Sequence, residues 1–88
     1  MAEQAVADLK NIGEKTAVWL NQIGVHTKAD LEQMGAVEAY WLIQQQRGGT
    51  TAVLLYALYG ALHDLHWNAL SQERKEILRQ QAKQLHFS

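Results

Sequence analysis

The sequence predicts an all-α fold, a compact bundle of five to six short helices. Three observations support this prediction. The chain contains no proline, it shows no run of alternating β-branched residues that would mark a strand, and its six glycines separate segments with helical spacing of apolar residues. With 88 residues, the chain forms a single domain over residues 1–88, because a second hydrophobic core would not fit.

The N-terminal part of the chain predicts two short helices. We expect the first at about residues 2–10 and the second at about residues 14–23, with Asn11-Ile12-Gly13 as the turn between them. Gly24 stands where a residue of left-handed backbone conformation would end the second helix.

The next two helices have clear boundary residues. The hydroxyl of Thr27 can cap a third helix, and Asp30, three positions later, can reach back to complete a capping box. Gly35 ends that helix. A fourth helix is expected over Ala36–Arg47, where Gly48-Gly49 stops it.

The fifth helix is expected to be the central one. It starts near Thr50, is apolar on nearly every face as far as Leu65, and therefore belongs in the interior. Gly60 lies inside it and costs about 1 kcal/mol relative to alanine, so we expect a neighbouring helix to cross closely there. Ser71 can cap a last helix, whose apolar stripe is Ile77, Leu78, Ala82 and Leu85.

The formal net charge of −1 does not favour a nucleic-acid-binding domain, since such domains usually carry a clear basic excess. The charge is unevenly distributed along the chain. Residues 1–44 hold three lysines against six acids, giving −3, whereas residues 45–88 hold five basic residues against three acids, giving +2. A polyanion would therefore prefer the second half.

Residues 9–25 have the layout of a helix-hairpin-helix, with an apolar residue, a turn of the form x-Ile-Gly and a helix that ends in Gly-Val. Such a turn can direct backbone N–H groups at the N-terminus of the second helix toward a phosphate oxygen. Lys10 or Lys15 could add a charge-assisted contact. Asn11 stands where this hairpin usually has glycine, and Asp8 and Glu14 flank the two lysines. The alternative is a compact turn that places Ile12 in the core.

A second candidate hairpin, Arg47-Gly48-Gly49-Thr50-Thr51, joins the fourth and fifth helices. Together the two turns could follow one phosphate backbone, although paired glycines before a capping threonine also serve simply to stop and restart a helix. The candidate nucleic-acid-binding residues are Lys10, Asn11, Ile12, Gly13, Lys15, Thr16, Arg47, Gly48, Gly49 and Thr50.

The last helix carries Lys75, Arg79 and Lys83 at intervals of four residues, with His86 close to the same line. We expect this ridge to be a solvated face opposite the apolar stripe, with contact to a nucleic-acid backbone as the alternative. The six Trp and Tyr residues fall on helical faces and are expected to pack in the core.

The sequence predicts neither catalysis nor a cofactor. There is no cysteine, His63 and His66 alone are too few ligands for zinc, and no nucleophile triad or phosphate-binding loop is present. The longest apolar run, residues 52–62, is too short to span a bilayer, and the N-terminus has no secretory signal. We therefore expect a cytoplasmic protein that is not an enzyme and binds no metal.

The ordered set of these motifs resembles the C-terminal domain of the bacterial competence regulator TfoX, also called Sxy. The resemblance begins with Leu9-x-x-Ile12-Gly13-x-Lys15-x-Ala17-x-Trp19-Leu20, and continues through Ile23-Gly24-Val25-x-Thr27-x-x-Asp30-Leu31 and Met34-Gly35-Ala36-Val37-x-Ala39-Tyr40. Its last parts are Leu54-Leu55-x-Ala57-Leu58-x-Gly60-Ala61 and His66-Trp67-x-x-Leu70, so it spans about residues 9–80.

This resemblance implies an all-helical domain that regulates DNA uptake together with a transcriptional activator and has no catalytic residues. Longer members carry an additional N-terminal α/β domain, so this chain is expected to be either a stand-alone version or a fragment. We therefore expect a regulatory binding domain that contacts a protein such as a transcriptional regulator, the DNA phosphate backbone, or both. The alternative is a SAM-like protein-interaction adaptor that binds no nucleic acid.

Overall fold

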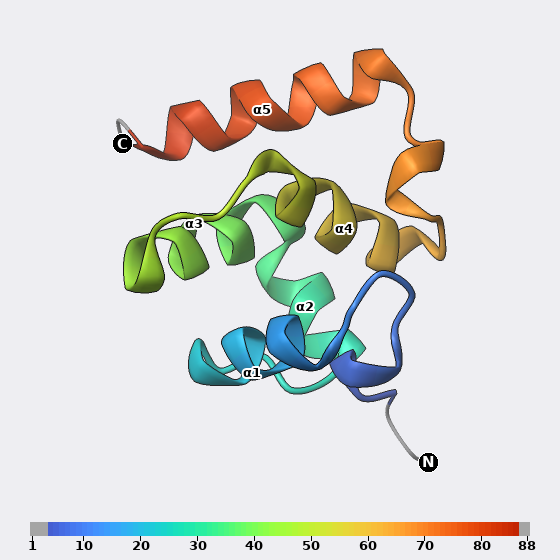
Figure 1. Ribbon diagram of the computed structural model, residues 1–88, viewed down its shortest axis with the longest axis vertical. Helices are drawn as coiled ribbons and strands as arrows, with labels where there is room; N and C mark the ends of the chain where they lie inside the picture. The colour runs from blue at the N-terminus through green and yellow to red at the C-terminus, as the bar shows by residue number, and fades with distance from the viewer. Residues whose placement is uncertain (1–3, 87–88) are drawn as a thin grey trace.

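Five α-helices and two short 3-10 helices form the structure, a computed structural model that describes residues 4–86 (Figure 1). The bounds of the α-helices are α1 (Glu14–Gln22), α2 (Lys28–Met34), α3 (Ala36–Arg47), α4 (Ala52–His63) and α5 (Gln72–His86). The 3-10 helices are η1 (Val6–Asp8) and η2 (Trp67–Ala69). No strand forms within residues 4–86, which confirms the all-α prediction.

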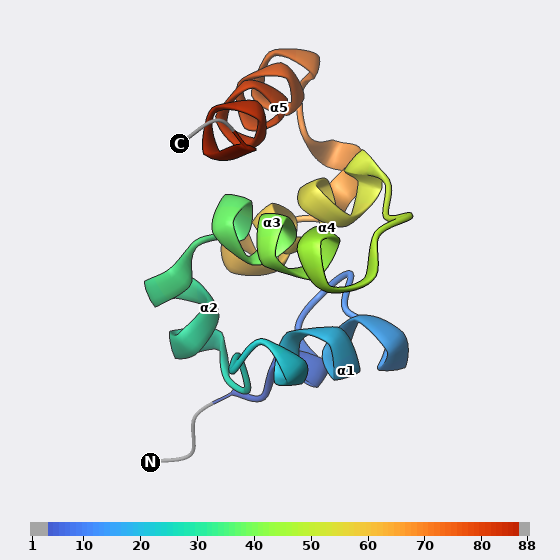
Figure 2. The same ribbon diagram turned by 90° about the vertical axis from the view of Figure 1, so that its left-hand side faces the viewer.

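The helices are arranged around α3 and α4, which lie side by side in the middle of the molecule (Figures 1 and 2). α1 and α2 lie on one side of this pair, and α5 crosses the opposite side, where it packs on both helices. Leu55 and Leu58 of α4 are fully buried, in two different clusters of the core. The prediction that the fifth helix is the central one is therefore confirmed.

The prediction of a helix over residues 2–10 is wrong for residues 4–10. The other residues of that range, 2 and 3, lie outside the described part of the chain. Only the single turn η1 is helical. Two backbone hydrogen bonds pair this segment instead with the start of α2 and the loop before it, with the Val6 N–H donating to His26 O at 3.1 Å and the Lys28 N–H donating to Gln4 O at 2.8 Å. A helix would have used these groups internally.

Elsewhere the predicted helix boundaries hold to within one or two residues, with α1 ending at Gln22 and α4 at His63. The Asp30 N–H donates to the Thr27 hydroxyl at 3.1 Å, and the Asp30 carboxylate accepts from the Thr27 N–H, so the capping box is present. The Arg74 N–H donates to Ser71 Oγ at 3.0 Å, which confirms the cap of the last helix. The N-cap of α4 is Thr51 rather than Thr50.

Other parts of the chain approach Gly60 closely, as predicted, but the prediction that a neighbouring helix does so is wrong. A Cβ atom at this position would lie 2.4 Å from Leu65 O and 2.5 Å from Asn11 Nδ2. Both atoms belong to loops that fold back against α4. The glycine therefore leaves room for loop polar atoms to approach the helix.

The orientation of α5 differs from the prediction. Lys75 is only 9% exposed, with Nζ 5.4 Å from the ring centre of Tyr56 and 5.6 Å from that of Trp67, whereas Ile77 is 38% exposed. Lys75 and Leu78 lie on the inward face of the helix. The long apolar stem of a lysine can pack over aromatic rings, and its ammonium group interacts favourably with the ring faces. A helix face that contains a lysine can therefore be buried.

Candidate functional site

The first predicted hairpin is occupied largely by structural contacts. Ile12 is buried in the core, as the compact-turn alternative predicted. Asn11 adopts the left-handed conformation, with φ of 73°, and its side-chain amide N–H groups donate to Leu65 O at 2.8 Å and Ala57 O at 3.3 Å. Its Oδ1 accepts from the Trp67 N–H at 3.2 Å. Asn11 therefore fastens the turn to the end of α4 and to η2.

The N-terminus of α1 beside this turn is open. Gly13 is exposed at the N-cap position and provides no side-chain cap, and Lys15 of the first turn is also exposed, with Thr16 half-buried. Lys10 Nζ lies 3.8 Å from the Asp64 carboxylate, with the Lys10 side chain about half exposed and that of Asp64 largely exposed. The exposed acids Asp8 and Glu14 are close in sequence. Anion binding at this helix end stays a prediction.

The second predicted hairpin is also tied to its surroundings. The Arg47 guanidinium lies 4.1 Å from the centre of the Trp19 ring on α1. Gly48 and Gly49 both have positive φ, and the Thr50 side chain and backbone N–H donate to Gln44 Oε1. Figure 2 shows α1 and the loop between α3 and α4 on the same side of the molecule. The contact between them involves the middle of α1 rather than its open N-terminus.

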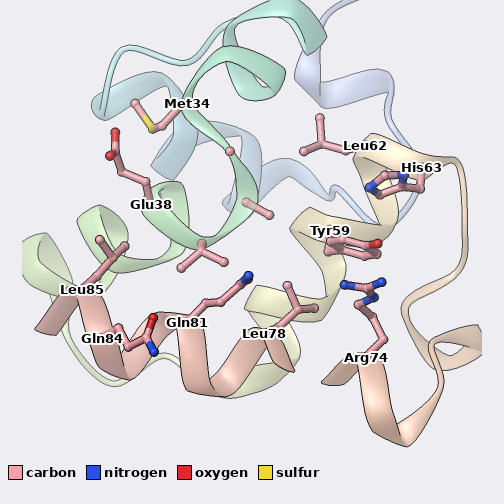
Figure 3. A pocket seen from close by; sticks show the side chains of 13 residues that line it. Met34, Glu38, Tyr59, Leu62, His63, Arg74, Leu78, Gln81, Gln84 and Leu85 are labelled. Carbon is pink, nitrogen blue, oxygen red and sulfur yellow. The ribbon is translucent and has the colours of Figure 1, made fainter. Parts of the chain in front are cut away.

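A cleft of about 640 Å³ lies between α5, the start of α3 and the end of α4 (Figure 3). We refer to it as the α5 cleft. Its apolar lining includes five half-buried side chains, a buried alanine and a buried leucine, and its rim is polar. The apolar residues are Met34, Ala36, Val37, Tyr59, Leu62, Leu78 and Leu85, and the exposed polar residues are Glu38, His63, Arg74, Gln81 and Gln84.

The two ends of the α5 cleft differ in charge. At one end, Tyr59 lies between His63 and Arg74, with the His63 ring centroid 4.3 Å from that of Tyr59 and the Arg74 guanidinium 5.5 Å from the same ring (Figure 3). The Glu38 carboxylate lies at the other end. The cleft therefore presents an apolar floor between a cationic end and an anionic end.

None of the α5 cleft residues was a predicted site residue. They come from three separate helices and from the junction between α2 and α3, so no short motif contains them. The apolar positions were visible in the sequence as core candidates. Their partial exposure depends on the distance at which α5 packs against α3 and α4, for which the sequence contains no local signal.

Within residues 4–86, no group of three or more histidine, cysteine, aspartate or glutamate side chains is placed to hold a metal ion. In the same part of the chain, none of the helices has both the length and the hydrophobicity needed to cross a membrane.

Two crystal structures of uncharacterized proteins from Listeria monocytogenes are similar to this fold. One, in a triclinic crystal form, has 28% sequence identity and a TM-score of 0.84, with 93% of each chain covered. The other, in a tetragonal form, has 29% identity and a TM-score of 0.81, covering 90% of this chain and 98% of that one. No curated protein matches the chain.

Residues 2–82, nearly the whole chain, match the family described as the TfoX C-terminal domain. This match includes both predicted hairpins, the central helix α4 and most of α5. The resemblance noted in the sequence motifs is thereby confirmed, and the chain belongs to the TfoX C-terminal domain family.

Proposed function

We propose that this chain is a non-enzymatic binding domain that takes part in regulating DNA-uptake competence, acting mainly through contact with a protein partner. Membership of the TfoX C-terminal domain family supports the regulatory role. The α5 cleft is the observation that carries the mode of action, because it exposes contiguous apolar surface on a domain whose net charge is close to zero.

The chemistry of the α5 cleft suits an amphipathic helix of the partner protein. The apolar side chains of the partner helix would contact Val37, Leu62 and Leu78, which lie on three different helices of this domain. An acidic residue of the partner would face Arg74, and a basic one would face Glu38. Charges at the rim favour one orientation of the bound helix and speed its association.

DNA contact is a second candidate, supported by the open N-terminus of α1. Its first-turn N–H groups have no side-chain cap, and Lys15 is exposed beside them. The inward-turned side chains of Asn11 and Ile12 leave few groups for a duplex. Such binding would be weak and would fall steeply as the salt concentration rises.

A photocrosslinking experiment in the host tests the protein contact. A photoreactive amino acid replaces Gln81, whose exposed side chain lines the α5 cleft, or Val18, which is exposed on α1 and lies outside it. We expect a discrete protein adduct from position 81 that disappears when Arg74→Glu is added, and no such adduct from position 18. Equal labelling from both positions, or none from position 81, would contradict the proposal.

The competence role and the DNA contact are separated by two variants. Arg74→Glu alters the α5 cleft, and Lys15→Glu alters the N-terminus of α1. If protein contact dominates, only Arg74→Glu lowers the transformation frequency, and fluorescence anisotropy detects no binding of duplex, single-stranded or branched DNA at any salt concentration. Salt-sensitive binding that Gly13→Val and Lys15→Glu weaken would instead favour the DNA contact. If position 81 gives the crosslinked adduct but Arg74→Glu leaves the transformation frequency unchanged, the domain is a protein-interaction adaptor that acts outside competence.

A further inference from the structure

A second cavity, of about 430 Å³, lies on the other flank of α5 from the α5 cleft. It is bounded by residues 40–45 of α3, the start of α4 and the C-terminal half of α5. We refer to it as the Trp41 pocket. Its volume falls within the range of about 300–1,000 Å³ that is typical of small-molecule sites.

The polar groups of the Trp41 pocket favour an anion. Two cations of α5, Arg79 and Lys83, line it, and no carboxylate does so among residues 4–86. Arg79 is held in place because its guanidinium donates to the Tyr56 hydroxyl at 2.6 Å and to the Glu76 carboxylate. Hydrogen bonding to Tyr56, followed by that to Glu76, raises the pKa of Arg79. The exposed Lys83 ammonium is the cation more available to a ligand.

The indole of Trp41 supplies a donor that the fold does not use. Trp41 Nε1 is buried and has no hydrogen-bond partner within residues 4–86. Buried indole N–H groups usually find a partner, because an unpaired donor has lost its hydrogen bond to water. An acceptor on a ligand would pair with this N–H after a small movement of the ring or of a neighbouring side chain.

The remaining lining residues of the pocket are two polar side chains, Gln44 and Gln45, and a set of aromatic and aliphatic ones. The rings of Tyr40 and Trp41 and the side chains of Leu55 and Ala82 line it. Aromatic walls favour a flat, unsaturated body through stacking. The required ligand thus has a planar apolar part and a charged group that accepts hydrogen bonds.

We propose that the Trp41 pocket binds a small aromatic carboxylate, with the ring against the aromatic side chains of α3 and the carboxylate facing Lys83. This inference does not depend on the proposed protein contact, because the two cavities use different residues of α5.

The test is a titration of the full chain with 1-naphthoate, followed by two-dimensional 1H–15N NMR. We expect saturable shifts of the Trp41 indole N–H and of the amides around Lys83. The matched neutral compound, 1-naphthamide, keeps the ring system and the acceptor but has no charge. It should bind about tenfold more weakly or not at all.

Two variants examine the assigned contacts. Lys83→Gln removes one exposed charge, and Trp41→Phe removes the indole N–H but keeps an aromatic wall, so both are expected to fold. Each should weaken 1-naphthoate binding about threefold to tenfold. Lys15→Gln, which removes a lysine far from the pocket, and Arg74→Glu, in the α5 cleft, should leave the affinity unchanged.

Several outcomes would overturn the proposal. These are the absence of a saturable shift, equal affinity for 1-naphthoate and 1-naphthamide, or the same affinity for Lys83→Gln and Lys15→Gln. Shifts centred on the α5 cleft and abolished by Arg74→Glu would also overturn it. Because the protein contact is measured by crosslinking at position 81, either proposal can fail without the other.

Discussion

The side chain of Asn11 connects the turn before α1 to distant parts of the chain by hydrogen bonds. It occupies a left-handed position and joins three backbone groups of residues 57, 65 and 67 to the turn before α1. Asparagine is among the few side chains that adopt this conformation readily, and its amide both donates and accepts. The residue that departs from the usual hairpin pattern therefore links the turn before α1 to α4 and to the segment that follows it.

This role predicts a graded loss of stability. Asn11→Ala removes the side-chain hydrogen bonds and leaves alanine, which adopts positive φ less readily than asparagine, at this position. The free energy of unfolding should therefore fall by about 2–4 kcal/mol. Asn11→Gly also loses the hydrogen bonds but tolerates the conformation, and should be about 1 kcal/mol less destabilising than alanine. Urea denaturation measures both. Wild-type stability of Asn11→Ala, or no difference between the two variants, would contradict the assignment.

At the scale of single elements, α2 depends on its capping box. The Asp30 carboxylate accepts from the His26 N–H at 3.0 Å and from the Thr27 N–H at 3.2 Å. The hydrogen bond from His26 is the largest cause of the lowered pKa of Asp30, the backbone and side chain of Thr27 lower it further, and partial desolvation opposes this shift. The folded protein therefore holds the charged carboxylate more strongly than the unfolded chain does.

The sign of the pH dependence follows from this lowered pKa. The contribution of Asp30 to stability is fully present above its ordinary pKa of 3.8 and is lost as the pH falls through the lower folded value. The stability difference between wild type and Asp30→Asn should therefore shrink in acid. Thermal denaturation across that range measures it, and a difference that stays constant or grows would contradict the expectation.

Thr27→Ala provides the contrast for this element. It removes the side-chain cap but leaves the two backbone N–H groups that bind the carboxylate, so it should cost about 1 kcal/mol. Most of this cost should persist in acid, because the hydrogen bond from the Asp30 N–H to the Thr27 hydroxyl does not need a charged carboxylate. A cost that vanishes in acid, in parallel with that of Asp30→Asn, would show that the two halves of the box are not separable.

At the scale of the whole molecule, α5 packs against the rest of the fold around one small apolar cluster. Its buried residues are Leu55, Tyr56, Leu70 and Leu78, and Leu78, at 2% exposed, is the buried leucine that α5 contributes beside the buried Lys75. A domain of this size has a stability of only about 4–13 kcal/mol. Loss of one well-packed leucine from this cluster should therefore be felt by the entire domain.

Leu78→Ala and Ile77→Ala form a matched pair of variants. The two residues are neighbours and lose similar atoms, but Ile77 is 38% exposed. Leu78→Ala should lower the free energy of unfolding by about 2–4 kcal/mol, and Ile77→Ala by less than about 1 kcal/mol. Chemical denaturation followed by circular dichroism measures this difference. Similar losses from the two variants would mean that α5 does not pack as described.

The extent to which this fold could be predicted from its sequence depends on the range of the interactions. The caps at Thr27 and Ser71 and the central position of α4 follow from residues within a few positions of one another. The segment before α1 was wrongly predicted as a helix because its backbone pairs with residues 26–28, about twenty positions away. Of the candidate site, Ile12 and Asn11 were identifiable as turn residues, but the partners of Asn11 more than 40 positions away were not.

The sequence alone determined the helical class, most of the helix boundaries and the family of this chain, because each depends on local spacing and on the order of short motifs. The tertiary structure decided which face of α5 is buried, what lies against Gly60 and where the two cavities open. These features depend on how helices distant in sequence pack against one another. A cation such as Lys75 can join a buried face once aromatic rings from other elements surround it.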